Sequence, residues 1–369
     1  MSGRADLVRL FGEDPIAFST LQSGLQYCDT SYGYIAYQRA WGIDITLGPP
    51  VAAPGDRAAL IDRFLRSQRR PVFCYLRGDA AQQVLQLAAL PPDRRMYAAR
   101  MGIDRLLHTH ALCDPATPIE KTRRGARKHA RRAGFSLRSV DPQDLSAAEL
   151  DRLAQITRAY LQKSQLPYEM RFLNRPFVPH EAQPTLLRAR TYLLLQRPQP
   201  DQPPHVFGYA VLNPWFGPER RSPVGYLLDI LRCEPTRQWG VFYAAVDALC
   251  QQLSSEGVAE LSLGFCPLHQ TQAEAAHEPD GAAAMPITSR SLSAQVAWLE
   301  RQLAAVPYVQ RLRELKMSLP GRSCPRYFVS PWPLVVPAFV ALMGACGVRL
   351  GSLLGPSLWQ SALQARRGE

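Results

Sequence analysis

The stretch 225-GYLLDILRCEP-235 and the residues that follow it decide the expected fold. Its apolar run carries Asp229 and Arg232. After a turn, the pattern predicts an amphipathic helix over about 241–253 and a second strand that ends at 264–268. An acid and a base therefore lie three residues apart at the end of a strand, just before a helix N-terminus. Such a position can hold polar chemistry against a rigid scaffold, and it equally suits a salt bridge that fixes the strand end.

Two apolar runs before this stretch extend the predicted sheet. Residues 191–196 (TYLLLQ) and 206–216 (VFGYAVLNPWF) read as strands, and a helical pattern over about 146–165 precedes them. The order is then strand, strand, strand, helix, strand. This order predicts an α+β fold with a mainly antiparallel sheet.

The first part of the chain, residues 11–105, shows a similar alternation but no obvious catalytic group. The first strand-like runs are consecutive in the sequence, and the helical patterns come after them. The predicted strands cover residues 32–38, 41–47 and 71–76, and the predicted helices cover about 56–67 and 80–90. The chain is long enough for about two domains of ordinary size.

A basic helix is predicted over about 119–133. No acid occurs between Lys121 and Arg138, while eight of those eighteen residues are Lys or Arg. Such a face binds phosphate groups by counterion release, without sequence specificity; the alternative is a merely solvated helix. The candidate phosphate-binding residues on this helix are Arg123, Arg124, Arg127, Lys128, Arg131 and Arg132.

The composition is that of a folded, strongly basic protein. The chain has 43 Lys and Arg against 31 Asp and Glu, a net charge of +12, which favours polyanionic partners such as RNA or an anionic membrane surface. The eight cysteines form no C-x-x-C, and His108 and His110 have no third ligand nearby, so no metal is expected. The N-terminus has no apolar segment typical of a signal peptide, which predicts a cytoplasmic protein.

The C-terminal tail is apolar. Residues 331–348 carry no charge, but prolines interrupt the start, and the unbroken part is far shorter than the roughly 20 residues of a spanning helix. Two alternatives stay open for this tail: an interfacial helix with arginines near lipid headgroups, or a helix packed on the domain.

Six stretches, taken in order, resemble the family of the C-terminal domain of phosphatidylglycerol lysyltransferases, the aminoacyl-phosphatidylglycerol synthases. They are GEDPIAFSTLQ (12–22), RRGARKHARRAGF (123–135), YEMRFLNRP (168–176), GYLLDILRCEP (225–235), LSLGFCPL (261–268) and LKMSLPGRSCPRYF (315–328). The resemblance implies an α+β protein with two acetyltransferase-like (GNAT) folds in tandem and mixed, mainly antiparallel sheets flanked by helices. We expect the first fold in residues 1–112, the second, catalytic fold in 113–330 and a membrane-associated or packed tail in 331–369.

Members of this family transfer an aminoacyl group from aminoacyl-tRNA to an acceptor hydroxyl, typically the glycerol of phosphatidylglycerol. On matching positions, Asp229 and Arg232 take the family's D-x-x-R place, Glu169 its upstream acid and Lys316 its late lysine. The implied partners are aminoacyl-tRNA, which is the donor substrate so that no cofactor is expected, and an anionic lipid or membrane surface. The sequence lacks the multi-span N-terminal region of the large members, which leaves the acceptor open between a lipid, a peptide and a metabolite. We expect a cytoplasmic protein, with a peripheral place at the inner face of the membrane as the further option.

The chemistry of these residues agrees with that reading. An aminoacyl ester is already activated, so an enzyme mainly has to position the acceptor oxygen and stabilise the tetrahedral oxyanion. Asp229 or Glu169 can orient or deprotonate the hydroxyl, while Arg232 and Lys316 can hold a phosphate or the developing charge.

Two other functions remain. An acyl-CoA-dependent GNAT N-acyltransferase would grip the pyrophosphate at the helix start, where this chain has Arg237, Gly240 and the bulky Phe242. The ring of Phe242 should hinder a close backbone approach, although Arg237 and Gly240 can still bind another phosphate. A non-catalytic protein that binds RNA or a membrane surface would need only the basic helix and the apolar tail.

Overall fold

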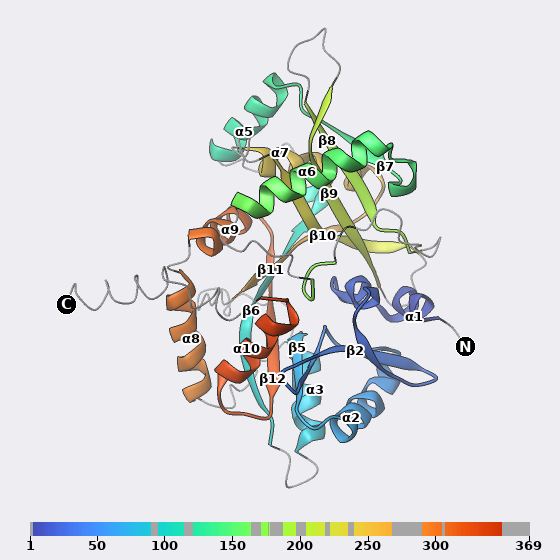
Figure 1. Cartoon of the computed structure of the whole chain (residues 1–369), viewed down its shortest axis with the longest axis vertical. Coiled ribbons are helices and arrows are strands. Elements are labelled where there is room, and N and C mark those ends of the chain that lie inside the picture. Colours follow the sequence, from blue (N-terminus) through green and yellow to red (C-terminus); the bar gives the residue numbers. More distant parts are fainter. Residues whose placement is uncertain are drawn as a thin grey trace, which may run out of the picture.

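One long sheet runs through the molecule (Figure 1). The computed structural model describes residues 3–89, 95–113, 121–163, 171–175, 177, 187–196, 204–217, 222–234, 240–267, 290–304 and 307–348. Within this part, twelve strands pair in the order β1-β2-β3-β5-β12-β6-β11-β10-β9-β8-β7, and β4 lies beside β2. The strands are β1 (Gln26–Asp29), β2 (Gly33–Ala40), β3 (Ile43–Thr46), β4 (Val51–Ala52), β5 (Pro71–Leu76), β6 (Tyr97–His108), β7 (Ser136–Val140), β8 (Arg190–Gln196), β9 (His205–Phe216), β10 (Pro223–Cys233), β11 (Glu260–Pro267) and β12 (Arg322–Ser330).

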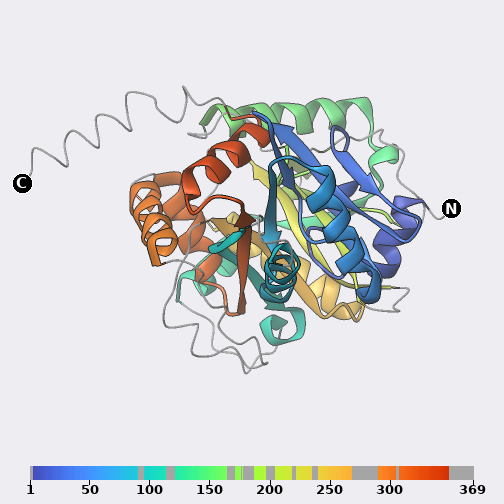
Figure 2. The same ribbon diagram turned by 90° about the horizontal axis from the view of Figure 1, so that it is seen from below.

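Helices cover both faces of the sheet (Figure 2). The α-helices are α1 (Arg4–Phe11), α2 (Arg57–Ser67), α3 (Gly78–Ala88), α4 (Thr109–Cys113), α5 (Lys121–Arg132), α6 (Ala147–Lys163), α7 (Val241–Ser255), α8 (Arg290–Ala304), α9 (Pro307–Met317) and α10 (Val335–Ala345). Short 3₁₀ turns occur at η1 (Ala17–Leu21), η2 (Pro54–Asp56) and η3 (Pro142–Asp144). Within the described residues, no helix combines the length and the apolar character needed to cross a bilayer.

The period-two alternation of the strands decides which helix covers which face. In β9, Tyr209 and Val211 pack with α6, whereas Ala210 and Leu212 pack with α7. In β5, Phe73 packs with α2 and α3, while its neighbours on either side pack with α10. Each face of the sheet therefore has its own apolar clusters, and the cluster that contains α10 also includes Trp215 and Leu227 of the second half.

Each half contains one parallel strand pair with a crossover helix. In the first half β3 pairs in parallel with β5, and α2 connects them. In the second half β10 pairs in parallel with β11, and α7 connects them. All other strand pairs described are antiparallel. The predicted α+β class, with mixed, mainly antiparallel strands flanked by helices, is confirmed.

The two halves exchange a strand in the middle of the sheet. β6 comes at the end of the first half but pairs with β11 of the second, and β12 comes at the end of the second half but pairs with β5 of the first. β6 and β12 pair with each other along most of their length (Figure 1). The predicted boundaries after residues 112 and 330 stay a prediction, and the exchange means that neither half has a complete sheet without the other.

Two bulges lie at related places in the halves. In β5, residues 74 and 75 stand opposite one residue of β12, and Tyr75 has φ +64°. In β11, residues 263 and 264 stand opposite one residue of β6, and Gly264 has φ +75°. Such bulges bend a strand and re-aim its side chains. They occur where the parallel partner strand ends its pairing, at Ile45 in β3 and Leu227 in β10.

The C-terminal apolar tail forms α10, which packs on the first half through Ala338, Ala341 and Ala345. Packing on the domain, one of the two alternatives for this tail, is thus observed for residues 335–345. The polar, alanine-rich sequence of residues 270–286 predicts a mobile loop, and these residues lie outside the described part of the chain.

Candidate functional site

Asp229 sits at a bulge of β10. Its neighbours Leu228 and Ile230 pair with the consecutive residues Leu212 and Val211 of β9, so Asp229 is the extra residue between them. The parallel pairing of β10 with β11 ends two residues earlier, at Leu227. The bulge and the end of pairing release the Asp229 side chain from the regular alternation of the strand.

The carboxylate of Asp229 is held by two hydrogen bonds. Its Oδ2 accepts from the backbone N–H of Arg175 at 2.9 Å and from Nδ2 of Asn213 at 2.9 Å. Asn213 also donates to Oγ of Ser19 at 3.3 Å, in the buried turn η1. Three separate segments therefore meet at Asp229, and one of them comes from the first half of the chain.

One hydrogen-bond acceptor beside this carboxylate has no partner among the described residues. Asn213 is buried, and its Oδ1 has no hydrogen-bond partner within the described part of the chain. A buried polar atom without a partner costs about 1–3 kcal/mol, so its presence next to Asp229 suggests a place for a donor group of a bound molecule.

Burial raises the pKa of Asp229 to about 7, against the hydrogen bonds from Arg175 and Asn213 and the positive charges of Arg175 and Arg232. Taken as a whole residue, Asp229 is half-buried. A carboxyl group whose pKa lies near neutrality can both accept and return a proton at physiological pH.

Arg232 is held in position by contacts with residues other than Asp229. Its Nη1 donates to Oη of Tyr209 at 3.3 Å, and the guanidinium lies 5.7 Å from the ring centre of Tyr160 in α6. Arg232 is buried, and it acts on Asp229 as a nearby positive charge. The strand-end salt bridge that the sequence left open is therefore not what holds Asp229, whose bonds go to Arg175 and Asn213.

Lys316 reaches the other strand of the same parallel pair. It is buried in the last turn of α9, and its Nζ donates to the carbonyl oxygen of Phe265 at 3.0 Å, just after the bulge of β11. A Cβ atom on Gly264 would lie 3.7 Å from Nζ of Lys316 and 3.3 Å from Cδ1 of Leu227. Glycine thus leaves room where Lys316 approaches β10. Burial lowers the pKa of Lys316, so its ammonium loses a proton more easily than an exposed lysine does.

A buried network of charged residues packs next to this part of the site. Arg326 of β12 bonds Asp14 and Asp104, and the hydroxyl of Tyr75 donates to Asp104. The ring of Tyr75 lies 5.4 Å from that of Phe265, whose carbonyl holds Lys316. The strained backbone of Tyr75 is therefore fixed by a network that ends at the candidate site.

The remaining predicted catalytic residue, Glu169, lies outside the described residues, as does Arg237. Arg175, six residues after Glu169 in the sequence, is described, and its backbone N–H donates to Asp229. Sequence reasoning missed Arg175, Asn213 and Ser19. A signal existed for Asn213, which interrupts an apolar strand with a polar amide.

The basic helix α5 has two sides. Arg123 is buried, and Arg123 and Arg127 both bond Asp247 of α7. These two arginines join α5 to α7, so Arg123 is not part of a phosphate-binding surface as the sequence suggested. The outer stripe carries the exposed residues Lys121, Arg124, Lys128 and Arg132, and the side chain of Arg131 lies outside the described part.

α5 also covers the start of α7. Gly240 has φ +76°, and a Cβ there would lie 3.0 Å from Cβ of Ala126. Both the backbone conformation and the close approach of α5 require glycine. The space beside this helix start, where an acyl-CoA enzyme would bind a pyrophosphate, is thus partly taken by α5.

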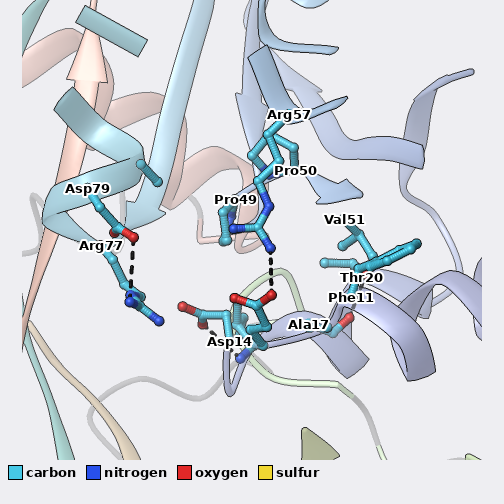
Figure 3. Close-up of a pocket in the computed structure, with 14 residues that line it drawn as sticks. Phe11, Asp14, Ala17, Thr20, Pro49, Pro50, Val51, Arg57, Arg77 and Asp79 are labelled. Atoms are coloured by element: carbon cyan, nitrogen blue, oxygen red, sulfur yellow. Dashed lines mark hydrogen bonds and ion pairs between the residues drawn. The ribbon is translucent and has the colours of Figure 1, made fainter. Parts of the chain in front are cut away.

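A hollow lies in the first half (Figure 3), between η1, the residues after β3 and the start of α3. Its charged groups are already paired: Arg57 bonds Glu13 at 2.9 Å, Arg77 lies 3.5 Å from Asp79, and Asp14 bonds Arg326. This hollow offers no uncompensated charge to a ligand. Ala17 and Thr20 of η1 line it, whereas Ser19 of the same turn faces Asn213.

Comparison with known proteins follows this geometry. The family model described as phosphatidylglycerol lysyltransferase, C-terminal, matches residues 5–329. The solved structure of L-PGS from Bacillus licheniformis is similar with a TM-score of 0.67 at 12% identity, covering 92% of this chain and 94% of that one. The C-terminal domain of a putative lysylphosphatidylglycerol synthetase from Agrobacterium fabrum is similar with a TM-score of 0.63 at 16% identity, covering 93% and 95%. No curated protein matches the sequence.

Proposed function

Since the chain belongs to the family of the C-terminal domain of phosphatidylglycerol lysyltransferase, we propose that it transfers an aminoacyl group from aminoacyl-tRNA to the hydroxyl of a phospholipid such as phosphatidylglycerol. The observation that carries this proposal is Asp229 itself, a carboxyl group at a strand bulge, oriented by Arg175 and Asn213 and with a pKa of about 7. A group of this kind suits the deprotonation of an alcohol at neutral pH.

The proposed reaction is an ester exchange. The acceptor hydroxyl attacks the carbonyl carbon of the aminoacyl ester, and its proton passes to Asp229. A C–O bond to the acceptor forms, the C–O bond to the tRNA ribose breaks, and the proton moves from Asp229 to the leaving ribose oxygen. Atoms and charge balance without a further reactant.

Positive charge on the β10 and β11 pair has a separate task in this proposal. Lys316 and Arg232 lie on or against the two strands of the parallel pair, and both are buried. A buried cation stabilises the oxyanion of the tetrahedral intermediate, or a lipid phosphate, more than an exposed one does. Glu169 stays a predicted second acid for orienting the hydroxyl.

The outer stripe of α5 fits the tRNA donor. Lys121, Arg124, Lys128 and Arg132 project to solvent on one side of α5, while Arg123 and Arg127 anchor its other side. A rigidly mounted basic stripe binds a phosphate backbone by counterion release. The packing of Ala126 on Gly240 favours this donor over acyl-CoA, because it limits access to the helix start.

The test uses purified full-length protein with vesicles that contain or lack phosphatidylglycerol, and tRNA charged with one labelled amino acid at a time. We expect label in a lipid product only with phosphatidylglycerol, loss of that product in Asp229→Asn, and no loss in the surface control Asp62→Asn. Parallel reactions with labelled acyl-CoA and amines test the acetyltransferase alternative. If label never leaves tRNA for any lipid or small acceptor, or if Asp229→Asn is as active as the parent, the proposal fails.

A further inference from the structure

α10 has no polar side chain on any face. Its sequence is VVPAFVALMGA, and the buried side, including Val335, Ala338 and Leu342, packs on the sheet. The outer side shows Val336 to solvent, with Phe339 and Met343 half-buried. A surface helix of a soluble domain normally has a polar outer face, so an apolar one indicates a partner.

Exposed large hydrophobic side chains gather around this helix. Trp41, Trp298, Leu334 and Val336 are between 50% and 54% exposed, and we call these four residues the apolar face. In the described part of the chain, Leu10 on α1 is the fifth large exposed hydrophobic, at 42%. Four of five therefore lie on α10, directly before it or on elements that contact it.

Specific contacts join the elements that carry the two tryptophans to α10. The ring of Trp41, at the turn between β2 and β3, lies 3.5 Å from where a Cβ of Gly344 would be. Trp298 is on α8, which lies beside α10 in both views (Figures 1 and 2). One turn of α8 earlier, Gln295 accepts from Val335 N–H at 3.1 Å and donates to the carbonyl of Pro333 at 3.3 Å.

Arginines border the apolar face. Arg69 and Arg70 are exposed at the start of β5, where the backbone oxygen of Arg70 accepts from Asp44 in the strand that follows Trp41. Arg301 is exposed one turn after Trp298 on α8. Two acidic residues also lie along this border, Asp44 and Glu300. Each already has an arginine partner: Asp44 bonds Arg39, and Glu300 bonds Arg313.

The apolar face is continuous with the Asp229 site. Cys346 follows α10 directly and is buried. Leu173 lies two residues before Arg175, which bonds Asp229, and Leu173, Cys346 and Leu227 belong to one hydrophobic core. The same packed layer thus runs from the outer helix to the strand that carries Asp229.

We propose that the apolar face docks on an anionic lipid bilayer, with α10 lying in the interface and Arg69, Arg70 and Arg301 at the headgroups. Eleven residues of helix span about 16 Å, against roughly 30 Å of bilayer hydrocarbon, so α10 lies in the surface and does not cross it. Tryptophan side chains suit this boundary because their rings are apolar and their N–H is polar. The arginine border favours a bilayer over a second copy of the chain, since a symmetric contact would bring like charges together.

This inference rests on the proposed function in one respect: if the acceptor is a membrane lipid, docking on the bilayer brings the site to its substrate. The test therefore measures docking without catalysis. Full-length protein is floated with vesicles of phosphatidylcholine alone or with phosphatidylglycerol added, and the double variant Trp298→Asp/Val336→Asp is compared with the matched control Leu10→Asp on α1. We expect flotation of the parent and the control with anionic vesicles, weakening with salt, and at least ten-fold less flotation of the double variant.

Two further measurements separate the outcomes. Asp229→Asn should float like the parent, so a failure of the proposed function does not remove the docking result. Transfer to vesicle lipid should fall in the double variant, while transfer to a monomeric short-chain phosphatidylglycerol should stay unchanged. Equal flotation of the double variant and the parent overturns the proposal, and so does a change in sedimentation mass at unchanged flotation, which would make the face a contact between copies.

Discussion

The side chain of Asp229 is oriented by the backbone N–H of Arg175, which lies 54 residues earlier in the chain and donates to Oδ2 at 2.9 Å. Asn213 completes the arrangement at the same oxygen. Because a main-chain donor and an amide hold the carboxylate, its position does not depend on an ion pair. The charge of Asp229 is therefore free to change during a reaction without loss of its position.

A first prediction concerns pH and activity. Burial raises the pKa of Asp229 to about 7, and the base that we propose is the deprotonated form. Transfer by the parent should rise with pH through about 7 and level off above it. The measurement is the pH profile of kcat/KM with phosphatidylglycerol as acceptor. A flat profile between pH 5.5 and 8.5 would contradict the assignment of Asp229 as the base.

The same pKa predicts an effect on stability. Asp229 titrates near 3.8 when unfolded and near 7 when folded, so folding favours its protonated form. That contribution is complete below about pH 4 and is lost as pH rises through about 7, up to roughly 2–4 kcal/mol. Asp229→Asn, which keeps both accepted hydrogen bonds, should therefore be more stable than the parent at pH 8 and similar at pH 4. Chemical denaturation of both proteins at the two pH values checks the sign.

A third prediction concerns Gly264 of β11. It separates the cost of backbone strain from the cost of crowding by a comparison with Gly257. Gly264 and Gly257 both have φ +75°, but only Gly264 has neighbours where a Cβ would go, at Leu227 and Lys316. Gly257→Ala should cost about 1–2 kcal/mol from its left-handed backbone alone. Gly264→Ala should cost more and also lower kcat, because the added methyl group presses on Leu227 beside Asp229. Equal losses of stability with normal kcat in both variants would mean that Gly264 has no role at the site.

Most of the fold could be predicted from the sequence, because apolar runs and helical patterns are local. The predicted strand at 71–76 coincides with β5, and the helix predicted from residue 241 begins there. β6 was not predicted, because Asp104 and Arg105 interrupt its apolar pattern. Those charged residues are buried with partners from distant parts of the chain: β12, more than 200 residues later, supplies Arg326 for Asp104 and Ser323 for Arg105.

The candidate site was predicted in part. Asp229, Arg232 and Lys316 could be named from the sequence and the family resemblance, and the structure places all three on or against the β10 and β11 pair. The partners of Asp229 could not be named, since Ser19, Asn213 and Arg175 meet only through tertiary packing. The sequence pattern of α5 also could not predict that one side of this helix is bonded to the rest of the protein, because its partner Asp247 lies in another helix.

A fourth prediction tests the two sides of α5. Lys128→Glu/Arg132→Glu changes exposed residues only, so it should weaken aminoacyl-tRNA binding and lower the salt dependence by about one unit of slope per cation that contacted a phosphate. The control Arg63→Glu/Arg66→Glu, on α2 at the far end of the molecule (Figure 1), should change neither. Affinity is measured by filter binding over a range of salt. Equal losses in both double variants would indicate a general charge effect and not a binding stripe.

The last prediction concerns the network that joins the two ends of the chain. Arg326 bonds Asp14, which is 312 residues away, and Asp104, and all three are buried. Arg326→Met leaves two buried carboxylates without their cation, which should cost about 3–5 kcal/mol. Because β6 and β12 are exchanged between the halves, we expect a single unfolding transition at lower temperature in calorimetry, with no separate transition for either half. Two resolved transitions would show that the halves fold independently in spite of the exchanged strands, and would remove the reason for placing Arg326 at the centre of the fold.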